Sequence, residues 1–222
     1  MSQFRSASPR PRQHAIAYRR FVFEPTDDLL LEPIEELPQP DFPRLLLHRR
    51  SGTSFGHLEP SRLEVLLAYS LRVVQVSGSH DDRMRCPVPS AGALHPLHLV
   101  VVANGEWRVY LPREHVLRRL RVDDTAASQI WAAMQGAFAA PSAIGLLALA
   151  EWGVTDALYE GAESLLLRES GGLLTHLGIV AEALGLSYRV LGPTGEPWAS
   201  RLVREATNRF VGAGTALVGT RP

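Results

Sequence analysis

Two neighbouring arginines and a serine form the first segment of this sequence that could bind a charged ligand. They are Arg49, Arg50 and Ser51, within "LLLHRRSGTSF". Two guanidinium groups beside a hydroxyl suit a phosphate, because guanidinium binds phosphate oxygens bidentately and serine adds a short hydrogen bond. The alternative is a solvated basic turn that ends a leucine-rich helix, and the segment taken alone favours that alternative.

A turn of small residues enters an apolar run in "RCPVPSAGALHPLHLVVV", residues 85–102. Pro89, Ser90, Ala91 and Gly92 leave the backbone N–H groups uncovered, so a flat or anionic ligand can approach the main chain. Gly92 can adopt backbone angles that other residues avoid, and the following strand holds the turn rigid. An ordinary strand-entry loop explains the segment equally well.

The third segment is "RESGGLLTHLGIVAEALGLSYRVLG", residues 168–192. It predicts a helix whose apolar residues form one buried stripe. His176 is a candidate acid or base, although a lone histidine on such a helix is more often a satisfied core or interface group. The stripe consists of Leu173, Leu177, Val180, Ala181 and Leu184.

The elements that must position these segments follow from the apolar patterns. "LHLVVVANGEWRVYLP" predicts a hairpin, since Asn104-Gly105 favours the positive φ angles of a tight turn. We expect helices over 59–76, 113–120, 124–138 and 159–185, the last interrupted at Gly171-Gly172. Strands are expected over 142–150, in "SYRVLG" and in "GTALVG". The mixture predicts an α+β domain with helices packed on a central sheet.

Composition excludes several classes of protein. The 222 residues suit one large domain or two small ones, and equal numbers of basic and acidic residues (23 each) predict no nucleic acid or membrane partner. Cys86 is the only cysteine, so no intramolecular disulfide can form, and the histidine spacing predicts no metal site. No Walker loop, GxGxxG or Gly-x-Ser-x-Gly motif is present. Without a signal-like or spanning apolar stretch, we expect a soluble cytoplasmic protein.

Taken in order, "RRS", "PSAGALHP" and the helix ending "ALGL" resemble the nitroreductase-like FMN flavoproteins. Within that superfamily the sequence is most similar to the SagB-type dehydrogenases, which oxidise thiazoline and oxazoline rings in modified peptides. The resemblance covers roughly residues 45–220. It implies a mostly antiparallel central sheet flanked by helices, in a dimer with FMN at the subunit interface. Residues 1–43, interrupted by prolines, are then an extended N-terminal arm, and residues 44–222 the FMN-binding domain.

The resemblance also implies residue roles. Arg49, Arg50 and Ser51 would meet the FMN phosphate and ribityl chain. The Pro89 turn would lie against the isoalloxazine ring, with backbone donors of Ser90, Ala91 and Gly92 near N5 and O4.

Three positions depart from the pattern of the resemblance. Thr53 stands where relatives carry a further cation, and Arg221 alone could supply the late basic residue by the phosphate. The Lys-Tyr pair of azoline oxidases reads Leu158-Tyr159 here, and leucine cannot act as a base. Tyr159 is therefore the candidate for proton handling, with His95 and His176 behind it, although a buried structural tyrosine is an equally good explanation.

The sequence thus predicts an FMN-dependent oxidoreductase that tailors a peptide or other natural product, with flavin N5 accepting hydride. Partner enzymes of a biosynthetic complex are compatible with this prediction. The alternative is a redox-inactive subunit of the same fold, acting as a scaffold or substrate-binding component. Thr53, Leu158 and the short C-terminus favour the alternative, and the intact "RRS" and "PSAGALHP" oppose it.

Overall fold

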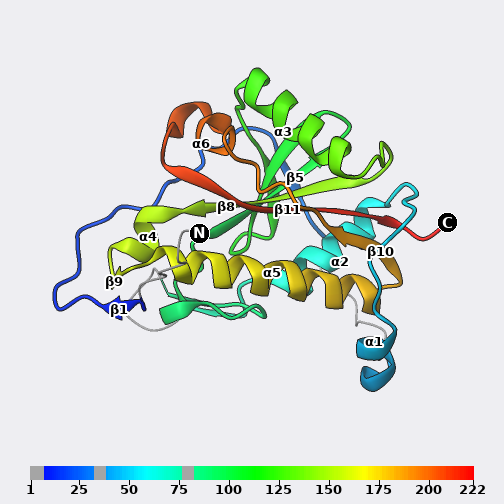
Figure 1. Cartoon of the computed structure of the whole chain (residues 1–222), viewed down its shortest axis with the longest axis horizontal. Helices are drawn as coiled ribbons and strands as arrows, with labels where there is room; N and C mark the ends of the chain where they lie inside the picture. Colours follow the sequence, from blue (N-terminus) through cyan, green and yellow to red (C-terminus); the bar gives the residue numbers. More distant parts are fainter. Residues whose placement is uncertain (1–7, 33–38, 77–82) are drawn as a thin grey trace, which may run out of the picture.

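A seven-stranded antiparallel sheet organises the chain (Figure 1). The computed structural model describes residues 8–32, 39–76 and 83–222. The sheet has the order β10-β11-β8-β5-β6-β7-β2, and two short two-stranded antiparallel sheets, β1-β9 and β3-β4, lie outside it. The strands are β1 (Arg10–Pro11), β2 (Asp28–Leu30), β3 (Gln75–Val76), β4 (Met84–Arg85), β5 (Leu97–Ala103), β6 (Glu106–Leu111), β7 (Val116–Arg119), β8 (Ile144–Glu151), β9 (Tyr159–Glu160), β10 (Leu186–Val190) and β11 (Phe210–Thr220).

Helices cover both faces of the sheet. The long helix α5 and the shorter α2 lie on one face, and α3 and α6 lie on the other (Figure 1). The helices are α1 (Phe42–His48), α2 (Pro60–Leu71), α3 (Asp124–Ala137), α4 (Trp152–Asp156), α5 (Glu163–Ala183) and α6 (Ala199–Leu202), with 3₁₀ turns η1 (Ala91–Ala93) and η2 (Arg204–Ala206). This is the α+β architecture that the sequence predicts.

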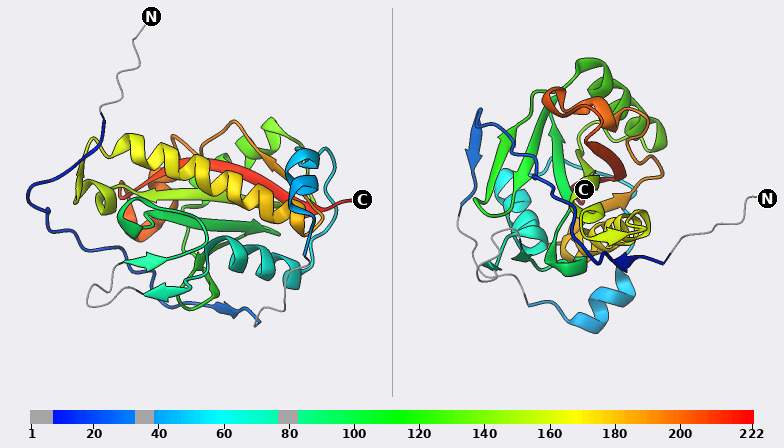
Figure 2. Two further views of the ribbon diagram at one scale, coloured as in Figure 1. Left: turned by 90° about the horizontal axis from the view of Figure 1, so that it is seen from below. Right: turned by 90° about the vertical axis from the view of Figure 1, so that its left-hand side faces the viewer.

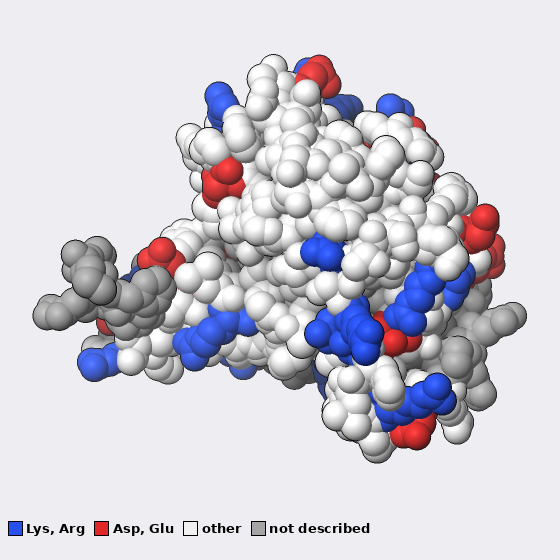
Figure 3. All heavy atoms as spheres, turned by 45° about the vertical axis from the view of Figure 1, so that its right-hand side comes forward, with Lys and Arg blue, Asp and Glu red and all other residues white. Residues whose placement is uncertain are grey.

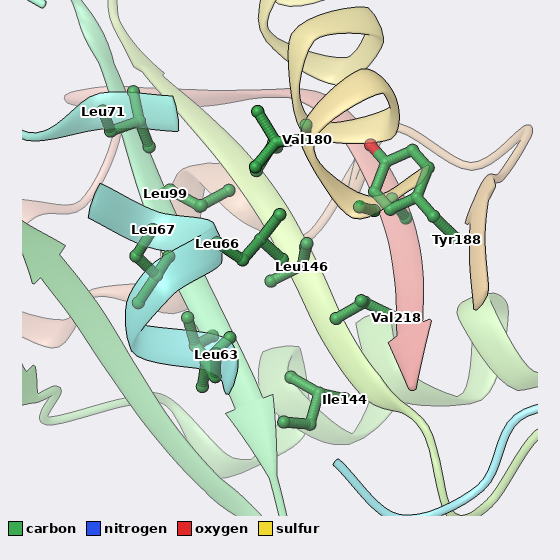
Figure 4. Close-up of a cluster of buried hydrophobic side chains, with 14 of the residues drawn as sticks. Leu63, Leu66, Leu67, Leu71, Leu99, Ile144, Leu146, Val180, Tyr188 and Val218 are labelled. Carbon is green, nitrogen blue, oxygen red and sulfur yellow. The ribbon is translucent and has the colours of Figure 1, made fainter. Parts of the chain in front are cut away.

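Each face of the sheet packs a separate hydrophobic core. On the α2–α5 face, Leu66 and Val180 point toward Leu146 of β8 (Figure 4). On the other face, Ile130 of α3 and Leu147 of β8 belong to the second cluster. Adjacent β8 residues point to opposite faces, and because both faces are covered, all eight β8 residues are buried.

The clearest local predictions are confirmed. β5 and β6 form the predicted hairpin, with Asn104 at φ 51° and Gly105 at φ 78° in its two-residue turn. The helix expected at 124–138 is α3, and the strand expected at 142–150 is β8. The two C-terminal strands are β10 and β11.

Four predictions of secondary structure are wrong. The helix expected over 59–76 ends at Leu71 and Gln75–Val76 is the strand β3, because the N–H groups of Val73 and Val74 donate to carbonyls elsewhere in the chain. Residues 113–120 contain the strand β7, not a helix, because pairing with β6 and β2 outweighs the helix propensity of this segment. The helix expected from residue 159 begins at Glu163, since Tyr159–Glu160 is the strand β9 and Gly161 takes φ 66°. α5 also runs unbroken through Gly171-Gly172, where a side chain would meet open space.

The described part of the N-terminal arm packs on its own chain. β1 pairs with β9 beside the N-terminal end of α5, and the arm then crosses to β2 at the edge of the sheet (Figure 2). Arg12 forms an ion pair with Asp156 at 2.9 Å, and its N–H donates to the Leu158 carbonyl. The rest of the predicted arm, residues 1–7 and 33–38, lies outside the described residues.

A buried carboxylate anchors this arm. The Glu151 side chain at the end of β8 is 0% exposed. Its oxygens accept hydrogen bonds from the Tyr18 hydroxyl (2.9 Å), the Phe21 N–H (2.7 Å) and Arg209 Nε (2.9 Å), and lie 3.0 Å from His98 Nε2. Burial alone raises the pKa of Glu151, but the contacts with His98, Phe21 and Tyr18 outweigh it and lower the pKa to about 2.

Replacing this carboxylate tests the anchor. We expect Glu151→Gln to lower the free energy of unfolding by about 3 kcal/mol, because it leaves buried donors and Arg209 without their charged partner. Glu160→Gln, at a side chain 65% exposed, is the matched control and should change stability little. Denaturant unfolding at neutral pH measures both variants, and equal stability of the two would contradict the anchor.

The same anchor predicts a pH dependence. Folding lowers the pKa of Glu151 from 4.5 to about 2, so its contribution is complete above pH 4.5 and is lost as pH falls toward 2. The stability difference between wild type and Glu151→Gln should therefore shrink over that range.

Candidate functional site

The turn between β4 and β5 is strained. Gly92 takes φ 61° within η1, and the non-glycine residues Ala93 and His95 take φ 56° and 45°. Residues other than glycine rarely adopt such angles, so the surroundings must hold the turn in place. Strain of this kind concentrates at binding and catalytic sites, which makes this turn the first candidate.

Glu169 of α5 holds the turn. Its Oε2 accepts a hydrogen bond from the Ser90 hydroxyl at 2.7 Å, and its Oε1 accepts from the Ala91 N–H at 3.0 Å. The Ser90 oxygen in turn accepts from the His95 N–H at 2.9 Å. Behind the turn, the Arg20 guanidinium of the arm donates to the Leu94 carbonyl. Burial raises the pKa of Glu169, and the hydrogen bonds from Ser90 and Ala91 offset this only in part.

Sequence reasoning missed Glu169, although a signal was present. Glu169 lies three residues after Leu166 and four before Leu173, which are both buried on α5. These spacings place all three on one helix face, so a carboxylate stands within the apolar stripe. A carboxylate in such a place needs hydrogen-bond donors, and the turn supplies them.

The structure brings Tyr159 to the same turn. A Cβ atom on Gly92 would lie 3.1 Å from the Tyr159 hydroxyl. Tyr159 reaches this position because β9 pairs with β1, opposite Pro11. Glycine is therefore required at position 92 both by its φ angle and by the close approach of Tyr159.

The two candidate histidines have carbonyl partners. His95 Nε2 lies 2.8 Å from the Met84 carbonyl, and burial lowers the pKa of His95. His176 Nε2 lies 3.1 Å from the Tyr69 carbonyl, between α5 and α2. Seven residues of helix, about 10 Å, separate His176 from Glu169, so His95 lies at the turn and His176 does not.

The predicted phosphate-binding residues lie together on an exposed loop after α1. Arg49, Arg50, Ser51 and Thr53 are all exposed, and within the described part of the chain neither Arg49 nor Arg50 forms an ion pair. The Gly52 N–H donates to the Tyr188 carbonyl at 2.8 Å, which fixes the loop beside β10. Arginines gather on this side of the molecule, over α1, β10 and the C-terminus (Figure 3).

Arg221 lies on the same side but is already engaged. Its Nη2 is 2.5 Å from Glu182 Oε2, and its Nε donates to the Leu186 carbonyl at 3.2 Å. A phosphate would have to compete with Glu182 for this guanidinium. Arg49 and Arg50 are the better placed cations.

The arginine loop and the strained turn lie at opposite ends of the sheet. The loop joins β10 at Tyr188, which is opposite Val218 of β11. The turn leads to Pro96, whose carbonyl accepts a hydrogen bond from the Glu151 N–H. Glu151 lies opposite Phe210 of β11. Eight residues of β11 separate these points, about 26 Å at 3.3 Å per residue. One copy of the chain therefore does not bring the two sets of residues together.

The large cavity among the described residues does not coincide with either set, and the turn adjoins only a very small one. A cavity of about 780 Å³ lies around the tip of the β5-β6 hairpin, and none of the residues predicted for the site lines it. A cavity of only about 10 Å³ adjoins Pro89, His95 and Glu169. The strained turn is thus a surface that a ligand or second chain could cover, rather than the wall of a deep pocket.

Comparison with solved structures identifies the fold. A nitroreductase-type protein from Ralstonia eutropha is similar over 97% of this chain and 99% of that one, at 16% identity and a TM-score of 0.68. A chain of the Escherichia coli microcin synthetase McbBCD complex, with truncated pro-MccB17 bound, is similar over 92% and 79%, at 16% identity and 0.61. A Desulfovibrio desulfuricans nitroreductase in complex with FMN covers 82% and 87%, at 15% identity and 0.51. The chain has the nitroreductase fold.

The sequence itself matches no known family model and no curated protein. Within the described residues, no helix is long and apolar enough to cross a membrane, and no cluster of His, Cys, Asp and Glu could hold a metal ion.

A pair of glycine variants tests the close approach at the turn. Gly92→Ala should lose about 1–2 kcal/mol of stability from its positive φ, and should also displace Tyr159. Gly105→Ala is the matched control, because Gly105 has φ 78° but nothing lies within 4 Å of its Cβ position. We expect similar losses of stability in the two variants, and a shift of the Tyr159 ring resonances in NMR spectra or a change in ligand binding only for Gly92→Ala. Identical behaviour of the two variants in every measurement would contradict the proposed contact.

Proposed function

We propose that this protein is an FMN-dependent oxidoreductase that acts as a dehydrogenase or oxidase on a peptide or other natural product. The observation that carries the proposal is the strained turn Ser90–His95, which Glu169 holds in place beside the Tyr159 hydroxyl. The nitroreductase fold supports it, since a D. desulfuricans protein of this fold is solved with FMN bound. When bound, FMN supplies the two-electron chemistry, with N5 as the hydride acceptor.

The residues present fit the two ends of FMN. Arg49 and Arg50 are exposed cations without ion pairs in the described part of the chain, and Ser51 adds a hydroxyl. Their donors match the geometry of a phosphate group. At the turn, Gly92 is exposed and carries no side chain, so a flat ring could approach its main chain.

The distance between these sets supports a homodimer with FMN at the interface. Along β11 the two sets are about 26 Å apart, so we propose that the arginines of one copy and the turn of the other share one FMN. Apolar side chains near the arginine loop also need a partner. Phe42 and Leu47 of α1 are 64% and 83% exposed.

The proton-handling group that we propose is Tyr159. Its hydroxyl lies against Gly92, where the ring is expected, whereas His95 and His176 contact carbonyls of their own chain. The base that azoline oxidation requires is missing, because Leu158 replaces it and all 23 basic residues of the chain are arginines. A substrate whose proton leaves from a more acidic group than an azoline carbon fits this site better. The likeness to a chain of the peptide-bound McbBCD complex supports a peptide substrate and partner enzymes.

A redox-inactive scaffold of the same fold is the second candidate. The observation that favours it is the engagement of Arg221 by Glu182, which leaves the phosphate site with fewer free cations. Failure to bind FMN under any condition, with retention of a peptide or partner protein, would establish this alternative instead.

Titration with FMN tests the proposed function directly. We expect Arg49→Ala and Arg50→Ala each to weaken FMN binding by about tenfold or more, since each removes a charge-assisted contact to the phosphate. Arg44→Ala is the control: Arg44 is an exposed arginine of the preceding helix α1, and the variant should bind FMN as the wild type does. Quenching of flavin fluorescence gives the FMN dissociation constants of the wild type and of the three variants. A wild type that binds no FMN, or an equal effect of all three variants, would contradict the proposal.

Mixed dimers test whether the site is shared between copies. The double variant Arg49→Ala/Arg50→Ala and the variant Gly92→Ala should each bind FMN poorly alone. A heterodimer of the two, isolated with two affinity tags, has one site built from both wild-type halves, so we expect FMN binding at one of its two sites. If each site came from a single copy, both sites of the heterodimer would carry a defect and no binding would return.

A further inference from the structure

Most donors of the strained turn are used by the protein itself. The Ser90 hydroxyl donates to Glu169, and the Ala91 N–H donates to the same carboxylate. The Ala93 and Leu94 N–H groups donate to the Ser90 and Ala91 carbonyls. Within the described part of the chain, the Gly92 N–H has no hydrogen-bond partner. The Ser90 N–H likewise has no hydrogen-bond partner in the described part of the chain, so two N–H groups of the turn are available to a ligand.

The two turn donors that bond to Glu169 suit a carboxylate at position 169, and the strain of the turn explains why it needs such support. A carboxylate has acceptors on both oxygens, so it can receive the Ser90 hydroxyl and the Ala91 N–H together, whereas an amide offers only one oxygen. Three residues of the turn have positive φ, two of them not glycine, and such a turn persists only when its surroundings fix it. Arg20 and Glu169 hold it from opposite sides.

We propose that Glu169 is a positioning residue of the FMN site: it clamps the turn, which leaves the Gly92 N–H free to donate to the cofactor, and it would place a carboxylate on the far side of the turn from the flavin ring. This inference rests on the proposed function. It adds a specific electrostatic role: with the ring against the turn, only the Ser90–Ala91 main chain would separate it from the Glu169 carboxylate. Negative charge there opposes the negative charge that FMN gains on reduction, and so lowers its midpoint potential.

The variant Glu169→Gln tests the clamp in the full-length protein. We expect FMN binding to weaken about tenfold, since one charge-assisted hydrogen bond is lost, and the midpoint potential of bound FMN to rise. Glu163→Gln, on the exposed first turn of the same helix, is the matched control and should change neither quantity. A merely structural role of Glu169 would alter affinity and stability but would leave the potential at the wild-type value.

Ser90→Ala provides a second variant that keeps the carboxylate. It should weaken FMN binding while leaving the midpoint potential near that of the wild type, because the charge remains. Unchanged affinity and potential in Glu169→Gln, with FMN bound by the wild type, would overturn the inference while the proposed function stands.

Hydrogen–deuterium exchange of the flavin-free protein tests whether Glu169 fixes the turn, independently of FMN binding. Exchange in residues 88–95 should accelerate in Glu169→Gln and not in Glu163→Gln, because the Ala91 N–H loses its acceptor. Equal exchange in both variants would overturn the clamp, whether or not FMN binds. A wild type without affinity for FMN would refute the proposed function, and the exchange result would still decide whether Glu169 fixes the turn.

Discussion

The end of β8 imposes the constraint on which this part of the molecule depends. β8 is buried along its whole length and ends in Glu151, a carboxylate without access to water. A charge in that position is stable only when several donors surround it, and those donors come from the arm, from His98 on β5 and from Arg209. Because Tyr18 and Phe21 of the arm donate hydrogen bonds to this carboxylate, the N-terminal arm lies across the end of the sheet.

The position of the arm in turn builds the candidate site. Its β1 pairs with β9 and so brings the Tyr159 hydroxyl to Gly92, while its Arg20 supports the turn at the Leu94 carbonyl. Glu169 supplies the remaining contacts from α5. Two carboxylates thus keep the turn in its strained conformation. Glu169 bonds to the turn directly, and Glu151 acts indirectly, because it anchors the arm that carries Arg20. We see this arrangement as a preorganised surface for a flat ligand.

The sequence predicted those features that local patterns specify. The Asn104-Gly105 hairpin, the helix α3 and the apolar strand β8 depend on neighbouring residues, and all three are confirmed. The segment 113–120 contains the strand β7 and not the predicted helix: it pairs with β6, which directly precedes it, and with the arm strand β2, which lies far earlier in the chain. Pattern alone also could not reveal that the two predicted ligand-binding sets lie at opposite ends of the sheet. Glu169 was missed because its role depends on a turn about 80 residues away.

The central claim is that this chain binds FMN through the Ser90–Gly92 turn and the Arg49–Arg50 loop. The most direct measurement is the visible absorption spectrum of the freshly purified protein, followed by release of any chromophore and its identification by chromatography. The account predicts the two absorption bands of oxidised flavin and the release of FMN. A colourless protein that takes up no FMN when it is supplied in excess would contradict the account.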